Sequence, residues 1–239
     1  MALNMADLFE HAVDTFPDRV ALICGDRQVT YRELEDEANR LAHHLAAQGV
    51  GRGDHVGLYA RNSVETVETL LATIKLRAAS ININYRYLRD ELAYHLRDAD
   101  LSALVHDQDL APVVDAVVPP GLPRVAIGAD FGEALSFDKA LSAVSGARDF
   151  SPRSPDDIFI IYTGGTTGHP KGVMWRHEDI WRTLGGGIDF ITGEPLKTSG
   201  CSPARAPRAT AWSAWPPRRL STAPPWWPRW PACSAGTRP

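Results

Sequence analysis

The residues best suited to chemistry form one short run, Tyr162–Val173, which reads Y-T-G-G-T-T-G-H-P-K-G-V. The three glycines before the lysine let backbone N–H groups come close to oxyanions, and the threonine hydroxyls are further donors. Lys171 adds a mobile positive charge. These residue types in this order predict a loop that binds a polyphosphate. The alternative is a flexible Gly/Thr hairpin between two strands, which needs no ligand.

Two common nucleotide-binding patterns do not fit this loop. A Walker loop requires G-x-x-x-x-G-K-[ST] opening directly into a helix, whereas Lys171 follows Pro170 and precedes Gly172. The dinucleotide fingerprint G-x-G-x-x-G does not occur in the chain, and the three glycines at 185–187 follow a helical pattern rather than a strand. The loop therefore belongs to neither class.

The segments before the loop alternate between strand and helix patterns. The run Thr30-Tyr31-Arg32-Glu33 is a capping box, and an apolar stripe continues from it to Gly49, which predicts a helix. The expected strands are 19–24, 55–60, 80–83, 102–106, 124–127 and 157–162, and the other expected helices are one ending at Pro17, 64–76 and 90–98. Dense prolines predict looser structure over 111–155. This alternation predicts parallel βαβ units, hence an α/β fold with parallel-rich layered sheets.

The composition divides the chain at Glu194. The whole chain is 44% hydrophobic and 23% charged, as in an ordinary globular protein. The first 194 residues hold all 29 acidic side chains against 18 basic ones, a net charge of −11, whereas the last 45 hold seven basic side chains and no acidic ones. Those 45 residues also contain ten prolines and five tryptophans. We therefore expect two parts, an α/β portion over 1–194 and an irregular tail over 195–239.

The sequence also predicts the compartment. The N-terminal segment carries Asp7, Glu10 and His11 where a signal peptide needs an apolar run, and no apolar run approaches the roughly 18 residues of a membrane span. The expected location is the cytoplasm. The three cysteines are far apart and fit no metal-ligand spacing, so no metal site is expected.

The loop resembles, at almost every position, the phosphate-binding signature of the AMP-forming acyl-CoA synthetases of the adenylate-forming superfamily. That signature is tyrosine or phenylalanine followed by T-S-G-T-T-G-x-P-K-G-V. Gly164 replaces the usual serine, which removes one hydroxyl donor but keeps the backbone donors. Other stretches similar to this family are the T-Y-x-E-L run at 30–34, the G-D-x-V run at 53–56, Asn62-Ser63, Lys75, Asn82–Tyr87 with Glu91-Leu92, and Val173–Asp179. The resemblance covers about residues 3–194.

This resemblance implies a two-step ligation that uses ATP, Mg²⁺ and coenzyme A. The carboxylate of a fatty acid or steroid side-chain acid attacks the α-phosphorus of ATP, pyrophosphate leaves, and the thiol of coenzyme A attacks the acyl adenylate. The residues expected to hold the β- and γ-phosphates are Thr163, Gly164, Gly165, Thr166, Thr167, Gly168 and Lys171. His177 is expected to cap the next helix rather than to touch a ligand.

Several parts that such a ligase needs have no match in the chain. They are the acyl pocket, the aromatic segment against adenine, the acidic residue for magnesium, the ribose-binding aspartate, the hinge and the small C-terminal domain with its lysine. We therefore expect no catalytic residue here and no completed acyl transfer. The alternatives are a non-enzymatic nucleotide-binding or partner-binding fragment and a truncated product without function. Loss of the rest of the domain should leave apolar surface uncovered, which predicts poor solubility.

The tail allows three interpretations. A basic segment with tryptophans could bind single-stranded nucleic acid, but the spacing is irregular, and we expect no nucleic-acid partner. A proline-rich linker is the second, although five tryptophans are many for a linker. The third is a shifted reading frame. Tryptophan has the single codon TGG, so the codons around it can be read in another frame. When reading starts at the third base of each codon, Trp226-Trp227 specifies Val and Trp227-Pro228 specifies Ala. The shifted frame can also spell P-L-H-G, which resembles a family segment, so we place a slip between Glu194 and Gly200.

Overall fold

The computed structural model describes residues 4–142, 144–163 and 169–184. Its centre is a seven-stranded sheet in the order β7-β6-β5-β3-β4-β8-β9. The strands are β3 (His55–Tyr59), β4 (Ala79–Asn82), β5 (Ala103–Asp107), β6 (Arg124–Ile127), β7 (Leu135–Ser136), β8 (Ile158–Thr163) and β9 (Lys171–Arg176). All neighbouring strands are parallel except β8 and β9, which form an antiparallel pair. The predicted α/β fold with a parallel-rich sheet is confirmed.

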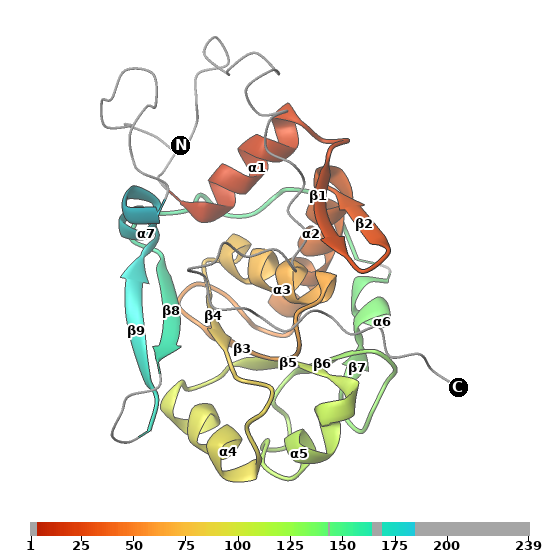
Figure 1. Cartoon of the computed structure of the whole chain (residues 1–239), viewed down its shortest axis with the longest axis vertical. Helices are drawn as coiled ribbons and strands as arrows, with labels where there is room; N and C mark the ends of the chain where they lie inside the picture. Colours follow the sequence, from red (N-terminus) through yellow and green to blue (C-terminus); the bar gives the residue numbers. More distant parts are fainter. Residues whose placement is uncertain (1–3, 143, 164–168, 185–239) are drawn as a thin grey trace.

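Helices cover both faces of this sheet (Figure 1). They are α1 (Met5–Thr15), α2 (Tyr31–Ala47), α3 (Val64–Lys75), α4 (Arg89–Asp98), α5 (Ala111–Asp115), α6 (Phe137–Leu141) and α7 (His177–Leu184), with a 3-10 turn at Gln108–Leu110. Along β3 the side chains alternate: Val56 and Leu58 join the core under α2, α3 and α6, while Tyr59 joins the core on the side of α4 and α5. This period of two is that of a strand buried on both faces.

A smaller unit packs on the outer side of α2 and α3. Strands β1 (Val20–Cys24) and β2 (Arg27–Thr30) form an antiparallel hairpin whose turn contains Gly25 at φ +60°. A third apolar cluster joins this hairpin to the helices α1, α2 and α3. The sequence indicated the turn but not β2, because this strand has one apolar residue, Val29, and runs directly into the capping box.

The predicted start of α2 is confirmed. Thr30 Oγ1 accepts a hydrogen bond from the backbone N–H of Glu33 at 3.2 Å, and Glu33 Oε2 accepts one from the backbone N–H of Thr30 at 2.8 Å. The proline-rich stretch behaves as expected, since it holds only the short elements α5, β7 and α6 around β6. None of the helices that the structure describes is long and apolar enough to cross a bilayer.

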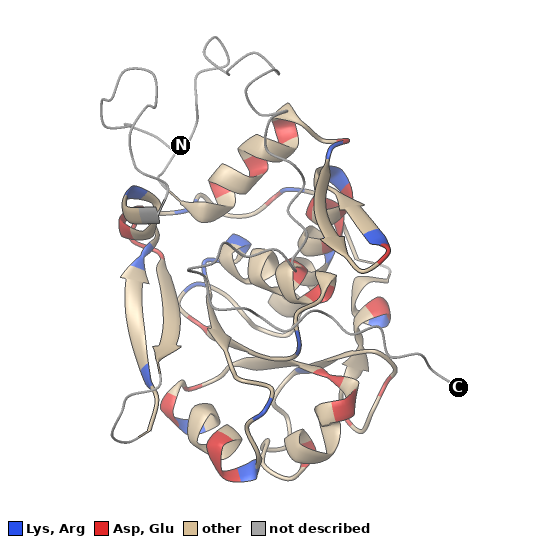
Figure 2. Ribbon diagram, viewed as in Figure 1, with Lys and Arg blue, Asp and Glu red and all other residues tan. Residues whose placement is uncertain are grey.

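A buried ionic cluster fastens α1, α2 and α3 to the segment before β8. Lys75 is 1% exposed, and its Nζ lies 2.6 Å from Glu10 Oε1 and 2.8 Å from Glu35 Oε2. Arg153 lies 2.6 Å from Glu10 as well, and Arg148 lies 2.8 Å from Glu35. Figure 2 shows acidic residues at successive positions along α1, which supplies acidic partners of this cluster. Lys75, which matched a family position, therefore has a structural role here.

A second buried carboxyl group predicts a pH dependence of stability. Glu68 on α3 is fully buried, and burial, followed by the neighbouring carboxyl groups of Glu37 and Glu65, raises its pKa from 4.5 to about 9. A raised pKa in the folded state means a contribution to stability that is complete below pH 4.5 and is lost as pH rises toward 9. Glu68→Gln should therefore be more stable than the wild type at pH 8, by at least about 1 kcal/mol.

Urea unfolding of both proteins between pH 5 and pH 8.5 measures this difference. The gap should narrow steadily as the pH falls toward 5. A gap that stays constant across the range, or a less stable Gln variant at pH 8, would show that Glu68 is ionised in the folded protein.

Candidate functional site

The glycine-rich loop joins β8 to β9 at one end of the sheet. Thr163 is the last residue of β8 and Lys171 is the first residue of β9, and the two are paired across the strands. Both side chains are exposed. The other predicted phosphate-binding residues lie outside the described residues: Gly164, Gly165, Thr166, Thr167 and Gly168. The structure therefore describes the two ends of the predicted site.

The position of Thr163 in the sheet suits ligand binding. Strands β3, β4 and β8 run parallel, so their carboxyl ends lie at the same edge, and Thr163 ends β8 there. Ligands of open α/β sheets bind outside the carboxyl ends of the strands. The predicted family segment Asn82–Tyr87 leaves β4 at this edge, and Tyr59 at the end of β3 donates a hydrogen bond to the carbonyl of Tyr87 at 2.5 Å.

The charge at this edge also suits an anion. Among the residues that the structure describes, no carboxylate lies within ion-pair distance of Lys171, in contrast to Arg176 at the other end of β9, which lies 2.8 Å from Asp156 and 3.0 Å from Glu178. An ammonium group without a partner and a threonine hydroxyl are donors that fit phosphate oxygens.

In the described part of the chain, no group of three or more His, Cys, Asp or Glu side chains could hold a metal ion.

Helix α4 holds both ends of the loop. Tyr162 Oη donates to Asp98 Oδ2 at 2.7 Å, just before the loop begins. Tyr94 Oη donates to the carbonyl of Pro170 at 2.8 Å, and its ring stacks on His169 with the centroids 4.5 Å apart. These contacts fix the backbone on either side of residues 164–168. Sequence reasoning missed this clamp, although Tyr94 and Asp98 are four residues apart and so share one face of α4.

A buried histidine, His95, packs against the tyrosines that hold the two ends of the loop. His95 is 1% exposed, and its ring lies between the rings of Tyr87, Tyr94 and Tyr162 at centroid distances of 5.3, 5.6 and 4.6 Å. Burial lowers the pKa of His95 despite its contact with the carbonyl of Glu91. The imidazole is therefore neutral at pH 7 and packs as an aromatic ring.

The clamp predicts a local change in Tyr94→Phe. Loss of the hydroxyl removes the hydrogen bond to Pro170 but leaves the ring stacked on His169. A hydrogen bond of this kind contributes about 0.5–1.5 kcal/mol, so the loop end should open several-fold more often. Trypsin cleavage after Lys171, followed by mass spectrometry, should be faster by that factor. Tyr85→Phe is the control, because in the described structure its hydroxyl has no hydrogen bond, and equal cleavage rates in the two variants would refute the clamp.

His177 does not perform the predicted role. It is the first residue of α7 and 1% exposed, but its Nδ1 accepts a hydrogen bond from the backbone N–H of Met5 at 3.3 Å. That N–H is one of those left free at the start of α1. Burial lowers the pKa of His177, in keeping with a neutral ring that accepts through Nδ1. The side chain of His177 thus caps α1 rather than α7.

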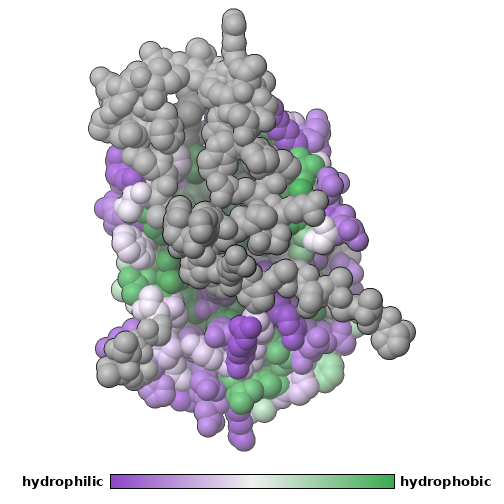
Figure 3. Space-filling view, in the orientation of Figure 1, coloured by the Kyte–Doolittle hydropathy of each residue, from purple (hydrophilic) through white to green (hydrophobic). Residues whose placement is uncertain are grey.

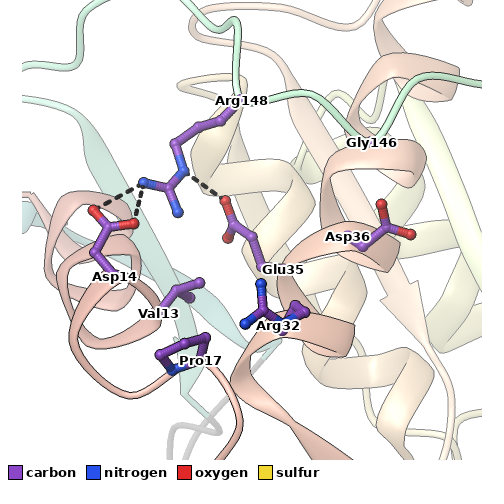
Figure 4. Close-up of a pocket in the computed structure, with 8 residues that line it drawn as sticks. All are labelled: Val13, Asp14, Pro17, Arg32, Glu35, Asp36, Gly146 and Arg148. Carbon is purple, nitrogen blue, oxygen red and sulfur yellow. Dashed lines mark hydrogen bonds and ion pairs between the residues drawn. The ribbon is translucent and has the colours of Figure 1, made fainter.

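A cleft of about 400 Å³ lies elsewhere, between α1, α2 and residues 146–148 (Figure 4). Arg148 crosses it and reaches Asp14 at 2.9 Å and Glu35 at 2.8 Å. The other lining residues are Val13, Pro17, Arg32, Asp36 and Gly146. Because its charges are paired within the protein and no loop residue lines it, the cleft joins the segment before β8 to the helices and does not extend the phosphate site.

Comparison with known proteins agrees with this architecture. The family described as AMP-binding enzyme matches residues 9–200. The 3-oxocholest-4-en-26-oate–CoA ligase of Rhodococcus rhodochrous is 52% identical over 82% of this chain and 37% of its own length. The medium/long-chain-fatty-acid–CoA/3-oxocholest-4-en-26-oate–CoA ligase of Mycobacterium marinum is also 52% identical, over 82% of this chain and 38% of its own. The chain thus spans less than two fifths of these relatives.

Solved structures give the same result for the fold. The anthranilate CoA ligase AuaEII, determined with anthranoyl-AMP, superposes with a TM-score of 0.71 at 30% identity, covering 76% of this chain and 36% of that chain. The N-terminal domain of FACL13 from Mycobacterium tuberculosis superposes with a TM-score of 0.68 at 31% identity, covering 78% of this chain and 48% of that chain. The described elements therefore match the first part of an adenylate-forming CoA ligase.

Proposed function

The chain belongs to the AMP-binding enzyme family, and we propose that its β8–β9 loop binds the β- and γ-phosphates of ATP. One observation supports this most strongly. The loop leaves the carboxyl end of a strand in a parallel sheet and returns at Lys171, whose charge has no carboxylate partner within the described structure. Gly164, Gly165, Thr166, Thr167 and Gly168 would surround the phosphates with backbone and hydroxyl donors, and Thr163 and Lys171 would flank them.

The reaction of the complete domain is an acid–thiol ligation. An oxygen of the substrate carboxylate bonds to the α-phosphorus of ATP as the bond to pyrophosphate breaks, which gives the acyl adenylate. The sulfur of coenzyme A then bonds to the acyl carbon, and AMP leaves. Mg²⁺ enters with the nucleotide as MgATP, since this ion is bound largely through substrate phosphates. Catalysis of such a transfer consists mostly of positioning and charge neutralisation, and Lys171 supplies part of both.

The acid is proposed to be a fatty acid or a steroid side-chain acid. The names of the ligases from Rhodococcus rhodochrous and Mycobacterium marinum, each 52% identical to this chain, support this class. The segment Asn82–Tyr87 also supports it, because it resembles that branch of the family. The family resemblance implies that the residues shaping the acyl pocket lie downstream of the loop, outside the part of the relatives that this chain spans.

This chain by itself is proposed to bind the nucleotide without completing acyl transfer. The chain spans only 37% of the Rhodococcus ligase, and none of the described residues is a candidate for the later steps. Saturable ATP binding without ATP–pyrophosphate exchange in the presence of fatty acids would support this. Exchange above background would show a competent adenylation site instead, and absence of ATP binding would refute the loop assignment.

Residues 195–239 are proposed to be the product of a shifted reading frame. The forced Val and Ala positions in the alternative frame support this, and the family match stops at residue 200, at the end of the interval proposed for the slip. Resequencing the gene across the codons for Asp189–Pro239 and several hundred bases beyond tests the proposal. A one-base difference that opens a long frame would support it, whereas a confirmed tail followed by closed frames would refute it.

A further inference from the structure

The hairpin of β8 and β9 carries an apolar face that nothing in the described structure covers. The strand register places Ile161 opposite Val173 and Phe159 opposite Trp175, so these four side chains share one face. Ile161 is 45% exposed, and Val173 and Trp175 are each 40% exposed. Apolar surface is visible at the left edge of the molecule in Figure 3, where Figure 1 places β8 and β9. We call these four residues the β8–β9 face.

On the opposite face of the hairpin, the side chains of β8 are covered, whereas Met174 on β9 is 71% exposed. Ile160 is 6% exposed, and it packs with Ile158, Tyr162 and the apolar side of α4. On the side of the β8–β9 face, α2, α3 and α6 cover the sheet from β3 to β6, and none of the four residues belongs to an apolar cluster. Strand β9 is also the edge of the sheet, so its outer N–H and C=O groups have no neighbouring strand among the described elements. Such an edge beside an exposed apolar face is typical of a surface that another chain segment covers.

The comparison structures indicate what covers it. The N-terminal domain of FACL13 superposes on 78% of this chain, but this chain accounts for only 48% of that domain. The elements α1 to α7 are therefore about half of one folded domain, and α7 directly follows β9. A second copy of this chain fits less well, because antiparallel pairing of β9 with itself along its whole length would place Lys171 opposite Arg176, and like charges directly opposite are destabilising.

We propose that the β8–β9 face is the docking surface for the part of an AMP-binding ligase that follows α7 in the relatives, and that this part binds when supplied as a separate polypeptide. The proposal rests on the proposed function only in taking the partner from the same family. Binding buries Ile161, Val173 and Trp175 and adds a strand or helix beside β9. The driving force is removal of apolar side chains from water, so association needs no ATP.

Co-expression tests the proposal. The full 239-residue chain is produced with a tagged polypeptide that consists of the part of the Rhodococcus rhodochrous ligase after the region matched here. Tag purification and analytical ultracentrifugation should give a one-to-one complex without added nucleotide. Val173→Lys and Trp175→Lys should weaken it roughly tenfold or more, because each places a charge in the buried interface. Leu88→Lys is the matched control, since Leu88 is 67% exposed at the start of α4, away from the face, and should change affinity little.

The outcomes separate this proposal from the proposed function. No complex, a complex that Val173→Lys and Trp175→Lys leave unchanged, or self-association alone would overturn the docking surface. Circular dichroism of the variants checks that the chain stays folded, as expected for exposed side chains. ATP–pyrophosphate exchange is measured separately. A complex without exchange would support the docking surface and count against the proposed function. ATP binding by the chain without a complex would support the proposed function and count against the docking surface.

Discussion

Replacement of Lys171 by methionine is expected to weaken ATP binding to this chain by about ten- to a hundredfold. Lys171 is exposed at the start of β9, and in the described structure no carboxylate competes for its charge. A charge-assisted hydrogen bond to a phosphate contributes about 1.5–3 kcal/mol, which corresponds to that range of affinity. Isothermal titration calorimetry with MgATP measures the change. The free energy of unfolding should stay the same, because the side chain makes no contact that the fold needs.

Lys139→Met provides the control for this experiment. Lys139 is also an exposed lysine, and it pairs with Asp130. It lies on α6, next to β6 and β7, at the edge of the sheet opposite β9. Its loss should leave ATP affinity unchanged. If both variants bound ATP as the wild type does, the loop would not be the phosphate site. If both bound it more weakly by the same factor, the effect would come from net charge rather than from position.

Replacement of Lys75 by methionine is expected to destabilise the fold by about 3–5 kcal/mol. Its ammonium group is the positive charge between Glu10 and Glu35, and its side chain is not exposed at all. Removing one partner from a buried ionic cluster costs about that much, because Glu10 keeps only Arg153 and Glu35 keeps only Arg148 as close cationic partners. Burial alone would raise the pKa of Glu10, but the hydrogen bonds and charges of Arg153 and Lys75 lower it overall. Without Lys75 part of that stabilisation is lost.

Urea unfolding monitored by circular dichroism measures this loss, and Lys139→Met again serves as the control. Lys139 belongs to an exposed pair, for which a cost of only about 0–1 kcal/mol is expected. Because Glu10 would become protonated more easily in the variant, its deficit should be smaller at pH 5 than at pH 7.5. A deficit below about 1 kcal/mol at pH 7.5 would show that the cluster does not hold α1, α2 and α3 together.

Much of the fold could be predicted because the signals are local. The strand–helix alternation, the capping box at Thr30 and the strand before the loop each lie within a few residues, and the structure confirms them. The expectation that this last strand is buried on both faces is wrong, because Ile160 is its one buried residue and Ile161 is exposed. Strand β2 was missed because Val29 is its one apolar residue and the strand runs directly into the capping box. Dense prolines predicted looser structure over 111–155 around a strand at 124–127, and the structure places β6 there among the short elements α5, β7 and α6.

The remaining features depend on contacts between residues far apart in the sequence. Glu10, Glu35 and Lys75 form one cluster only after three helices have packed, so no local pattern marks them. For the same reason His177 was assigned to the helix that it begins, while its ring caps α1, 172 residues earlier in the chain. Within the described residues, exposed apolar side chains are present on the β8–β9 face, where the rest of the domain is expected to pack. Solubility itself stays a prediction.

Hydrogen–deuterium exchange with and without MgATP tests the central claim most directly, since it locates the nucleotide on the chain. We expect ATP to slow exchange in peptides that cover 162–173 and to leave the ion cluster and the cleft beside α1 unchanged, because backbone N–H groups of the loop bind the phosphates. The same protection should be clearly weaker in Lys171→Met at an ATP concentration close to the dissociation constant of the wild type. Protection confined to another region, or none at saturating ATP, would contradict the assignment of the β8–β9 loop as the phosphate site.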